Sequence, residues 1–292
     1  MSGLYLTIEQ SLDGFEMAKN NKYSISEAKA QQWIKAGRGS GEGGNYKPWI
    51  TVRDIPSEGR SHRVFGHKTQ RTHHLLSDLE LAVFLLLEWH TETTDIREQF
   101  PLRQADTLAL AKEAGIDHPS SNGVIHTMSS DFLVNTSNTD QPKFALQAKY
   151  AQAMQDPRTI EKLELERRYW QQKAVPWQLI TEQDIPKAVF QNISWLCPAQ
   201  RDELNDELIT DRQEFYSHQF QKYPNKTIIE IAKKLDVEYN LAVGESLLEI
   251  RQLLARRCFI FDILTPTNKL KASDLQSENM ATFMEVVRVS NQ

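Results

Sequence analysis

The sequence predicts an α/β domain built on a mixed sheet and, after it, a smaller, mainly helical domain. Strand-like and helix-like segments alternate up to about Ile185, which is the pattern of a sheet covered by helices. After Pro186 the pattern becomes mainly helical, and 292 residues suffice for about two domains. We therefore expect an N-terminal extension (residues 1–23), a first domain (residues 24–185) and a second domain (residues 186–292).

The first expected helix begins at Ser24 and ends at Gly37. Ser24 can cap it together with Glu27 three residues later, and Gly37 favours a helix end. A glycine-rich loop then continues to Gly44. Two strand-forming stretches follow, residues 47–55 (KPWITVRDI) and residues 62–76 (HRVFGHKTQRTHHLL), the second as a hairpin that turns at residues 66–70.

The remainder of the first domain alternates between helices and strands. The helix expected at residues 77–90 is apolar on nearly all sides, so it should be buried. The other expected elements are strands at residues 94–102, 127–135, 143–150 and 176–181, and helices at residues 107–116 and 159–173.

The second domain contains one recognisable supersecondary pattern. Residues 227–263 are expected to form a helix, a turn, a second helix and a strand, with Arg256 and Arg257 at the start of the strand. This order resembles a helix-turn-helix followed by a wing. We therefore expect a winged-helix-like domain in which Arg256 and Arg257 contact DNA.

Composition narrows the class of protein. Hydrophobic residues make up 40% and charged residues 25% of the chain, as in ordinary globular proteins. The longest apolar run (residues 81–87) is too short to cross a bilayer, and no secretion signal opens the chain, so we expect a cytoplasmic protein without membrane contact. Cys197 and Cys258 are expected to be reduced. A net charge of −5 argues against DNA binding by bulk charge alone.

A local basic patch nevertheless lies in and before the predicted hairpin. Only Asp54 and Glu58 oppose its positive charge. The patch is either a solvated hairpin or a surface that contacts DNA phosphates, and a metal site at its histidines has neither cysteines nor tight spacing in support. The basic residues are Arg53, Arg60, Arg63, Lys68 and Arg71, and the histidines are His62, His67, His73 and His74.

Acidic and basic side chains are expected to lie close together on the strands at residues 127–135 and 143–150. Gln147 and Lys149 are two residues apart, so they lie on one face of a strand, and Asp131 begins the strand before it. Glu80, on the buried helix, can add a second carboxylate. Such a cluster suits Mg²⁺-dependent phosphodiester hydrolysis. The alternatives are structural: Ser77 and Glu80 fit a capping box, and the other three can be ordinary strand or turn residues.

Several long blocks of this sequence, in order, resemble the TnsA family, the endonuclease subunits of heteromeric cut-and-paste transposases of bacterial transposons. The resemblance is strong from residue 24 to residue 196 and looser beyond. It implies the fold of type II restriction endonucleases for the first domain. The family's acid, acid, Q-x-K pattern falls on Glu80, Asp131, Gln147 and Lys149, and Glu166 matches a further acid with possible catalytic support. The blocks include YKPWITVRDIPSEGRSHRV, HHLLSDLELAVFLLLEW, DIREQFPL, MSSDFLV, FALQAK and EKLELERRYWQQK.

The resemblance also implies a mechanism and partners. Glu80, Asp131 and Gln147 would bind Mg²⁺, with Mn²⁺ as a substitute, and Lys149 would position water or stabilise the transition state. The expected product is a cut 5′ strand at each transposon end, while the TnsB transposase cuts the 3′ strand under the AAA+ regulator TnsC. The second domain would contact DNA and TnsC, and the protein would associate with the nucleoid during transposition. A stand-alone restriction or repair nuclease and a non-catalytic scaffold subunit are the alternatives.

Overall fold

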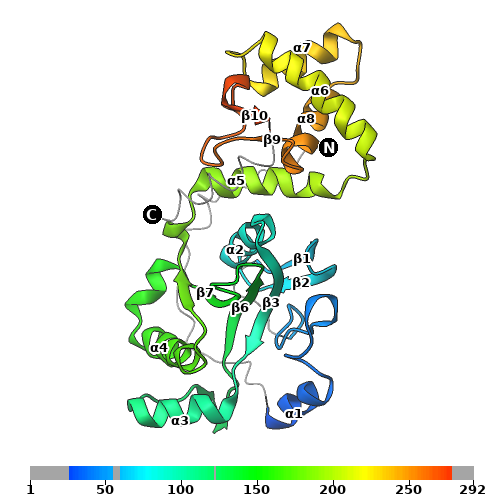
Figure 1. Ribbon diagram of the computed structural model, residues 1–292. Helices are drawn as coiled ribbons and strands as arrows, with labels where there is room; N and C mark the ends of the chain where they lie inside the picture. The colour runs from blue at the N-terminus through cyan, green and yellow to red at the C-terminus, as the bar shows by residue number, and fades with distance from the viewer. Residues whose placement is uncertain (1–25, 55–59, 122, 278–292) are drawn as a thin grey trace.

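A four-stranded mixed sheet lies at the centre of the N-terminal half of the chain (Figure 1). The computed structural model describes residues 26–54, 60–121 and 123–277. The first three strands of the sheet are antiparallel and the fourth runs parallel to the third, so the predicted mixed sheet is confirmed. In spatial order the strands are β3 (Thr93–Pro101), β6 (Ser129–Thr136), β7 (Lys143–Ala148) and β8 (Trp177–Ile180).

Helices pack on both faces of this sheet because successive side chains of a strand point to opposite sides. On one face, α2 (Asp78–Trp89) packs its apolar residues against Phe132 and Leu146. On the other face, α3 (Gln104–Ala114) and α4 (Pro157–Gln172) pack against Leu133 and Ala145. The neighbouring residues Phe132 and Leu133 therefore belong to different cores, as alternation requires.

Local signals fix the ends of these helices. Ser77 caps α2 with its hydroxyl oxygen, which accepts a hydrogen bond from the backbone of Glu80. Asp156 caps α4, and Pro157 occupies its first turn, where proline is tolerated. Gly115 ends α3 in a left-handed conformation (φ 64°), which glycine adopts without strain. The helices and strands expected between residues 77 and 181 are thus present, with end points shifted by a few residues.

The first helix, α1 (Glu27–Lys35), begins later than expected. Its N-cap is Ser26, whose side chain accepts from the backbone N–H of Lys29. Ser24, the predicted cap, lies outside the described residues. The capping assignment to Ser24 is therefore replaced by one to Ser26 for the part of the chain that the structure describes.

The expectation of a strand at residues 47–55 was wrong for residues 47–54, the part that is described. This segment makes no ladder, because side chains bind its backbone in a turn. The Asp54 carboxylate accepts from the backbone N–H of Thr51 at 2.9 Å, and Arg38 donates to the same carboxylate at 2.6 Å. Trp49 packs edge-on against Trp33 of α1.

Three further two-stranded pairings complete the described strands. The predicted hairpin is present as β1 (His62–Gly66) and β2 (Arg71–Leu75). A short hairpin, β4 (Ser120–Ser121) and β5 (Val124–Ile125), was not predicted. The third pair joins β9 (Phe259–Ile260) to β10 (Gln276–Ser277) in the C-terminal part.

The C-terminal part is mainly helical, as expected. The order helix, turn, helix, strand occurs as α7 (Ile228–Glu238), α8 (Glu245–Ala255) and β9. These elements and α6 (Asp206–Lys222) enclose one apolar core. Its largest fully buried members include Tyr216, Ile228, Ile231 and Leu235.

The helix α5 (Lys187–Leu196) joins the two halves (Figure 1). Its buried residues Val189 and Ile193, with Cys197 just after its end, pack against α2 residues, including Trp89. Arg257, at the end of α8, lies 4.6 Å from the ring centroid of Trp89 and donates to its carbonyl oxygen. The buried helix α2 is therefore covered by the sheet on one side and by α5 on the other. Among the described residues, no helix is both long enough and apolar enough to cross a membrane.

Candidate active site

The structure brings the four predicted residues of the acid and Q-x-K pattern to the same end of β6 and β7. Asp131 Oδ2 lies 3.8 Å from Lys149 Nζ and accepts a hydrogen bond from the backbone N–H of Ala148 at 2.9 Å. The backbone N–H of Asp131 donates to Gln147 Oε1 at 3.0 Å. These contacts follow from the antiparallel pairing of β6 with β7, which sets Phe132 opposite Leu146.

Glu80 reaches this group from the first turn of α2. Its backbone N–H donates to Ser77 Oγ at 3.0 Å, and its Oε1 accepts from the Ser77 hydroxyl at 3.1 Å. Its Oε2 accepts from the backbone N–H of Leu76 at 2.9 Å. The predicted capping box is thus present in one half only, because Ser77 caps the Glu80 backbone while the Glu80 side chain binds the Leu76 N–H instead of the Ser77 N–H. These contacts leave Glu80 Oε2 within reach of the Gln99 amide.

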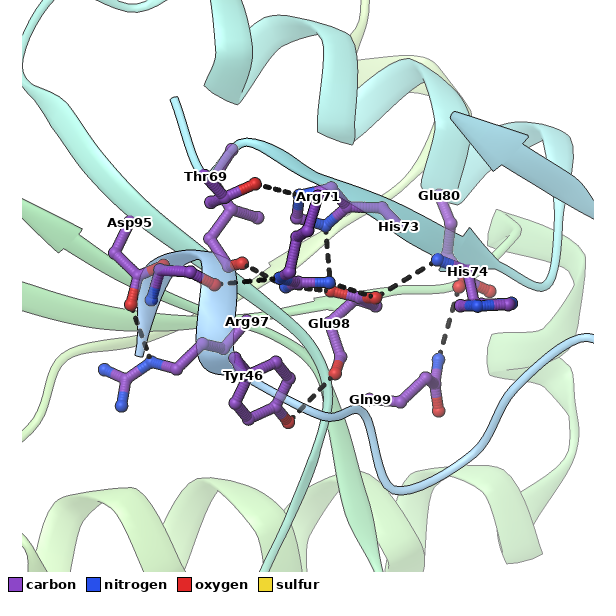
Figure 2. Close-up of polar contacts among 12 residues, drawn as sticks. Tyr46, Thr69, Arg71, His73, His74, Glu80, Asp95, Arg97, Glu98 and Gln99 are labelled. Atoms are coloured by element: carbon purple, nitrogen blue, oxygen red, sulfur yellow. Dashed lines mark hydrogen bonds and ion pairs between the residues drawn. The ribbon is translucent and has the colours of Figure 1, made fainter. Parts of the chain in front are cut away.

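Sequence reasoning missed the side chain that connects the two acids. Gln99, on β3, donates from Nε2 to Glu80 Oε2 at 3.2 Å and to Asp131 Oδ1 at 3.4 Å (Figure 2 shows the contact with Glu80). In the sequence, Gln99 is one polar residue in a strand, without a recognisable motif. Its importance comes from a backbone conformation that no local pattern indicates.

Burial and like charge shift the protonation of the cluster. Burial, and then the neighbouring Asp131 carboxylate, raise the pKa of Glu80 to about 8. Burial acts to lower the pKa of Lys149, but Asp131 and Glu80 outweigh it, so the net shift is upward and Lys149 is a cation. The Lys149 side chain is 37% exposed, so the cluster opens to solvent there. Burial and the Asp131 carboxylate thus favour the neutral form of Glu80 unless a further positive charge lies beside it.

Glu166 lies behind Asp131, on α4, and is fully enclosed by protein. Its Oε1 accepts from Ser130 Oγ at 2.6 Å and from Trp177 Nε1 at 2.9 Å. The Ser130 hydroxyl in turn accepts from Trp170 Nε1 at 2.7 Å. Burial raises the pKa of Glu166 to about 8 despite these hydrogen bonds. Glu166 thus belongs to a hydrogen-bonded network between the sheet and α4.

A second buried network fixes the β1–β2 hairpin to β3. Glu98 Oε1 and Oε2 accept from the two terminal nitrogens of Arg71 at 2.8 and 2.5 Å (Figure 2). His73 Nδ1 lies 2.8 Å from Glu98 Oε2, and His73 Nε2 lies 2.6 Å from Thr69 Oγ1. Although burial opposes ionisation, the hydrogen bonds and charges of His73 and Arg71 lower the pKa of Glu98 to about 2. Glu98 is the residue before Gln99, so this network also holds the backbone beside the acids.

The basic residues predicted to contact DNA differ in their exposure to solvent. Arg53, Arg60 and Arg63 are exposed. Lys68 is partly buried near Glu88, and burial lowers its pKa. Arg71 is buried in its pair with Glu98, so the expectation that it contacts DNA is corrected: both terminal nitrogens of its guanidinium donate to Glu98.

The two arginines at the end of α8 also contact the protein itself. Arg256 donates to the carbonyl oxygens of Ala199 and Asp202, and Arg257 donates to that of Trp89. Both arginines are half-buried, and their contact with DNA stays a prediction. Their guanidinium groups satisfy backbone carbonyls in the C-terminal part and at its junction with α2.

The histidines of the hairpin make separate contacts. His62 Nε2 lies 2.6 Å from Asp78 Oδ1, whereas His73 is enclosed with Glu98. No group of three or more His, Cys, Asp or Glu side chains within the described ranges is arranged to hold a metal ion. The cluster of Glu80, Asp131 and Gln147 is not such a group either, because it has two carboxylates and one amide.

Comparison with known proteins now gives the family. A model described as "TnsA-like endonuclease N terminal" matches residues 90–182, and one described as "TnsA endonuclease C terminal" matches residues 184–263. The chain is 46% identical over 275 residues to the transposon Tn7 transposition protein TnsA of Escherichia coli, a match that covers 94% of this chain and 100% of that protein. The chain belongs to the TnsA family of transposition proteins. It is an endonuclease subunit for transposition.

Proposed function

We propose that this endonuclease cuts the 5′ strands at the ends of its transposon, using the cluster of Glu80, Asp131, Gln147 and Lys149 with a bound Mg²⁺ ion. The observation that carries the proposal is the convergence of two buried carboxylates on one amide nitrogen, with Lys149 Nζ 3.8 Å from one of them. Hard carboxylate oxygens are the ligands that Mg²⁺ prefers.

The residues present fit a divalent cation. Glu80 Oε2 and Asp131 Oδ1 lie within 3.2 and 3.4 Å of the same nitrogen, and their mutual repulsion in a buried setting favours a positive charge between them. Gln147 Oε1 already accepts from the Asp131 backbone, so Gln147 offers its second lone pair or its backbone carbonyl. When bound, the ion would polarise the phosphate and favour ionisation of water. Mn²⁺, which accepts the same oxygen ligands, would substitute.

The side chains of this chain then have separate roles in the proposal. Glu80 and Asp131 hold the ion and are themselves fixed by Ser77 and by the backbone of Ala148. Lys149 orients the attacking water or offsets negative charge that develops on the phosphate in the transition state. Glu166 accepts from Ser130, the residue before Asp131, and would support the site from there.

The wider assembly is part of the proposal. A TnsB transposase would cut and join the 3′ strands, and the AAA+ regulator TnsC would couple target choice to excision. The C-terminal part, in which α7, a turn, α8 and the short β9–β10 pair follow one another, would contact DNA and TnsC. The net charge of −5 supports delivery to DNA by a partner.

DNA contact by the protein itself is proposed for the exposed arginines of the basic patch, Arg53, Arg60 and Arg63. Replacing Arg63 with alanine is expected to weaken binding to all sequences and to lower the slope of log K against log salt by roughly 1, because one phosphate contact is lost. Fluorescence anisotropy of labelled duplex DNA over a salt series measures this slope. Lys112→Ala, at an exposed lysine of α3 outside the basic patch, is the control and should leave the slope unchanged. An unchanged slope for Arg63→Ala contradicts the assignment.

The proposal is tested with transposon-end DNA labelled separately on each strand and incubated with the cognate TnsB and TnsC. We expect 5′-strand cuts with Mg²⁺ or Mn²⁺, loss of those cuts on chelation, and their recovery when the metal is restored. Cuts by this chain alone on unrelated DNA would favour a stand-alone nuclease. Unchanged 5′ cuts in the absence of this chain would favour a scaffold role.

A further inference from the structure

Gln99 has an unusual backbone for a residue inside a strand. Its φ is 48°, in the left-handed region that side chains other than glycine seldom occupy. The residue is buried, with 3% of its surface exposed, and its carbonyl oxygen accepts from the backbone N–H of Trp49 at 3.2 Å. Such a conformation is unfavourable for residues other than glycine and persists where its surroundings impose it, often at functional sites.

This conformation coincides with a break in the alternation of β3. Glu98 turns toward the β1–β2 hairpin on the α2 side of the sheet, and Gln99 turns to the same side to contact Glu80. Phe100 lies on the opposite side, against Trp170 of α4. Regular alternation would have placed Gln99 on the α4 side, away from Glu80.

The opposite strand, β6, shows the same break. The register pairs Glu98 with Phe132 and Phe100 with Ser130, so Gln99 lies opposite Asp131. Phe132 packs on the α2 side, and Ser130 bonds Glu166 of α4. Asp131, between them, turns toward the Gln99 side chain and hence toward the acid on α2. The alternation of side chains is therefore broken in both strands at the pair of Gln99 and Asp131. This break brings the Asp131 side chain to the face of the sheet on which Glu80 lies.

The Gln99 amide is oriented by a further hydrogen bond. Ser129 Oγ donates to Gln99 Oε1 at 3.3 Å, which leaves Nε2 directed at the carboxylates. A single –NH₂ group has two hydrogens, and here each has one carboxylate oxygen as its acceptor. Glu80 Oε2 and Asp131 Oδ1 are thereby held at a fixed separation and in a fixed orientation.

We propose that Gln99 is a positioning residue that pre-organises Glu80 and Asp131 as a pair of ligands for a divalent cation, through its left-handed backbone and its bridging amide. This inference rests on the proposed function, because it assumes that the two acids bind metal. Partners of this kind orient the ligating side chains, and their loss typically weakens metal binding by 10–100-fold.

The test is the replacement of Gln99 with glycine. Glycine accepts the left-handed backbone without strain, so the fold is retained while the amide is lost. Gln70 is the matched control: it is also a glutamine with a left-handed backbone (φ 55°), but it is exposed and donates to the His67 carbonyl in the hairpin turn. Mn²⁺ alone is titrated calorimetrically into the full-length wild-type chain, Gln99→Gly and Gln70→Gly, and thermal unfolding is recorded for each.

We expect the Kd for Mn²⁺ to rise 10–100-fold in Gln99→Gly and to stay unchanged in Gln70→Gly, with both variants still folded at the temperature of the titration. In strand-cleavage assays the half-saturating metal concentration should rise in Gln99→Gly while kcat at saturating metal changes little. A second variant, Gln99→Asn, tolerates the same backbone but is one methylene shorter, and it should weaken Mn²⁺ binding as well.

Two results would overturn the inference, and they differ in what they imply. If the wild type and Gln99→Gly bind Mn²⁺ equally, Gln99 has no positioning role although the metal site stands. If the wild type binds no Mn²⁺ and cuts DNA without metal, the proposed function itself fails and this inference fails with it.

Discussion

Replacing Lys149 with alanine is expected to lower the rate of 5′-strand cleavage by about 10²–10³-fold, the usual effect of removing one group that stabilises a transition state electrostatically. Lys149 Nζ lies 3.8 Å from Asp131 Oδ2, and Asp131 and Glu80 keep it protonated by raising its pKa. Without it, the two carboxylates lose the ammonium group that lies beside Asp131. Single-turnover cleavage of 5′-labelled transposon-end DNA measures the effect, with 3′-strand cutting by TnsB as the internal standard.

The matched control for Lys149→Ala is Glu166→Gln. Glutamine keeps the acceptor oxygen that Ser130 and Trp177 require, and Glu166 is buried behind the site, with a pKa raised to about 8 by burial. We expect this variant to cut within about tenfold of the wild-type rate, because the loss of a general acid or base would lower the rate by more than that. Full cleavage by Lys149→Ala, or loss of cleavage in Glu166→Gln, would reverse the roles proposed for the two residues.

Replacing Glu98 with alanine is expected to lower the free energy of unfolding by about 3–5 kcal/mol, because one partner of a buried ion pair disappears and the other stays buried. Arg71 and His73 both depend on this carboxylate, with side-chain exposures of 8% and 0%. The hairpin then loses the carboxylate that binds it to β3 beside Gln99. Urea unfolding followed by tryptophan fluorescence measures the change.

The same network predicts a dependence of stability on pH. The pKa of Glu98 is about 2 in the folded chain, below the ordinary value of 4.5. The unfolded chain therefore takes up a proton first as the pH falls, so this stabilisation is complete above about pH 4.5 and is lost between there and pH 2. Glu98→Ala lacks this contribution, and its stability should fall less steeply across that range.

Glu164→Ala is the control for Glu98→Ala. The pKa of Glu164 is also lowered to about 2, by hydrogen bonds from Arg167 and Arg168. Its side chain lies at the surface, however, where solvent screens the pair, so we expect a loss below about 1 kcal/mol. An equal decrease in the free energy of unfolding for the two variants would mean that the buried network at Glu98 stabilises the fold no more than a surface ion pair does.

Apart from the short β4–β5 hairpin, the helices and the strands of the sheet between residues 77 and 181 could be predicted, because their apolar residues follow helix or strand periodicity and several helix ends carry caps. The segment at residues 47–54 resembles a strand by composition, yet Asp54 binds its backbone locally in a turn. The break in alternation at Gln99 and Asp131 was not predictable, since period-two reasoning assigns neighbouring residues to opposite faces.

The active-site cluster could be predicted only in part. Family resemblance indicated Glu80, Asp131, Gln147 and Lys149, and the structure brings them together, whereas Gln99 carried no local signal. Both interpretations of the basic patch, a solvated hairpin and a surface that contacts DNA, place its arginines at the surface, where arginine usually lies. The partner that buries Arg71 is Glu98, 27 residues away, and such distant pairing is not visible in the sequence.

The most direct measurement of the central claim compares wild type with Asp131→Asn in the strand-specific cleavage assay, with TnsB, TnsC and Mg²⁺. Asparagine keeps an acceptor oxygen for the Ala148 backbone N–H and removes the charge, so the fold is retained while the proposed cation site is weakened. We predict that 5′-strand cuts disappear and 3′-strand cuts remain. Equal 5′-strand cutting by both proteins would contradict the assignment of cleavage to this cluster.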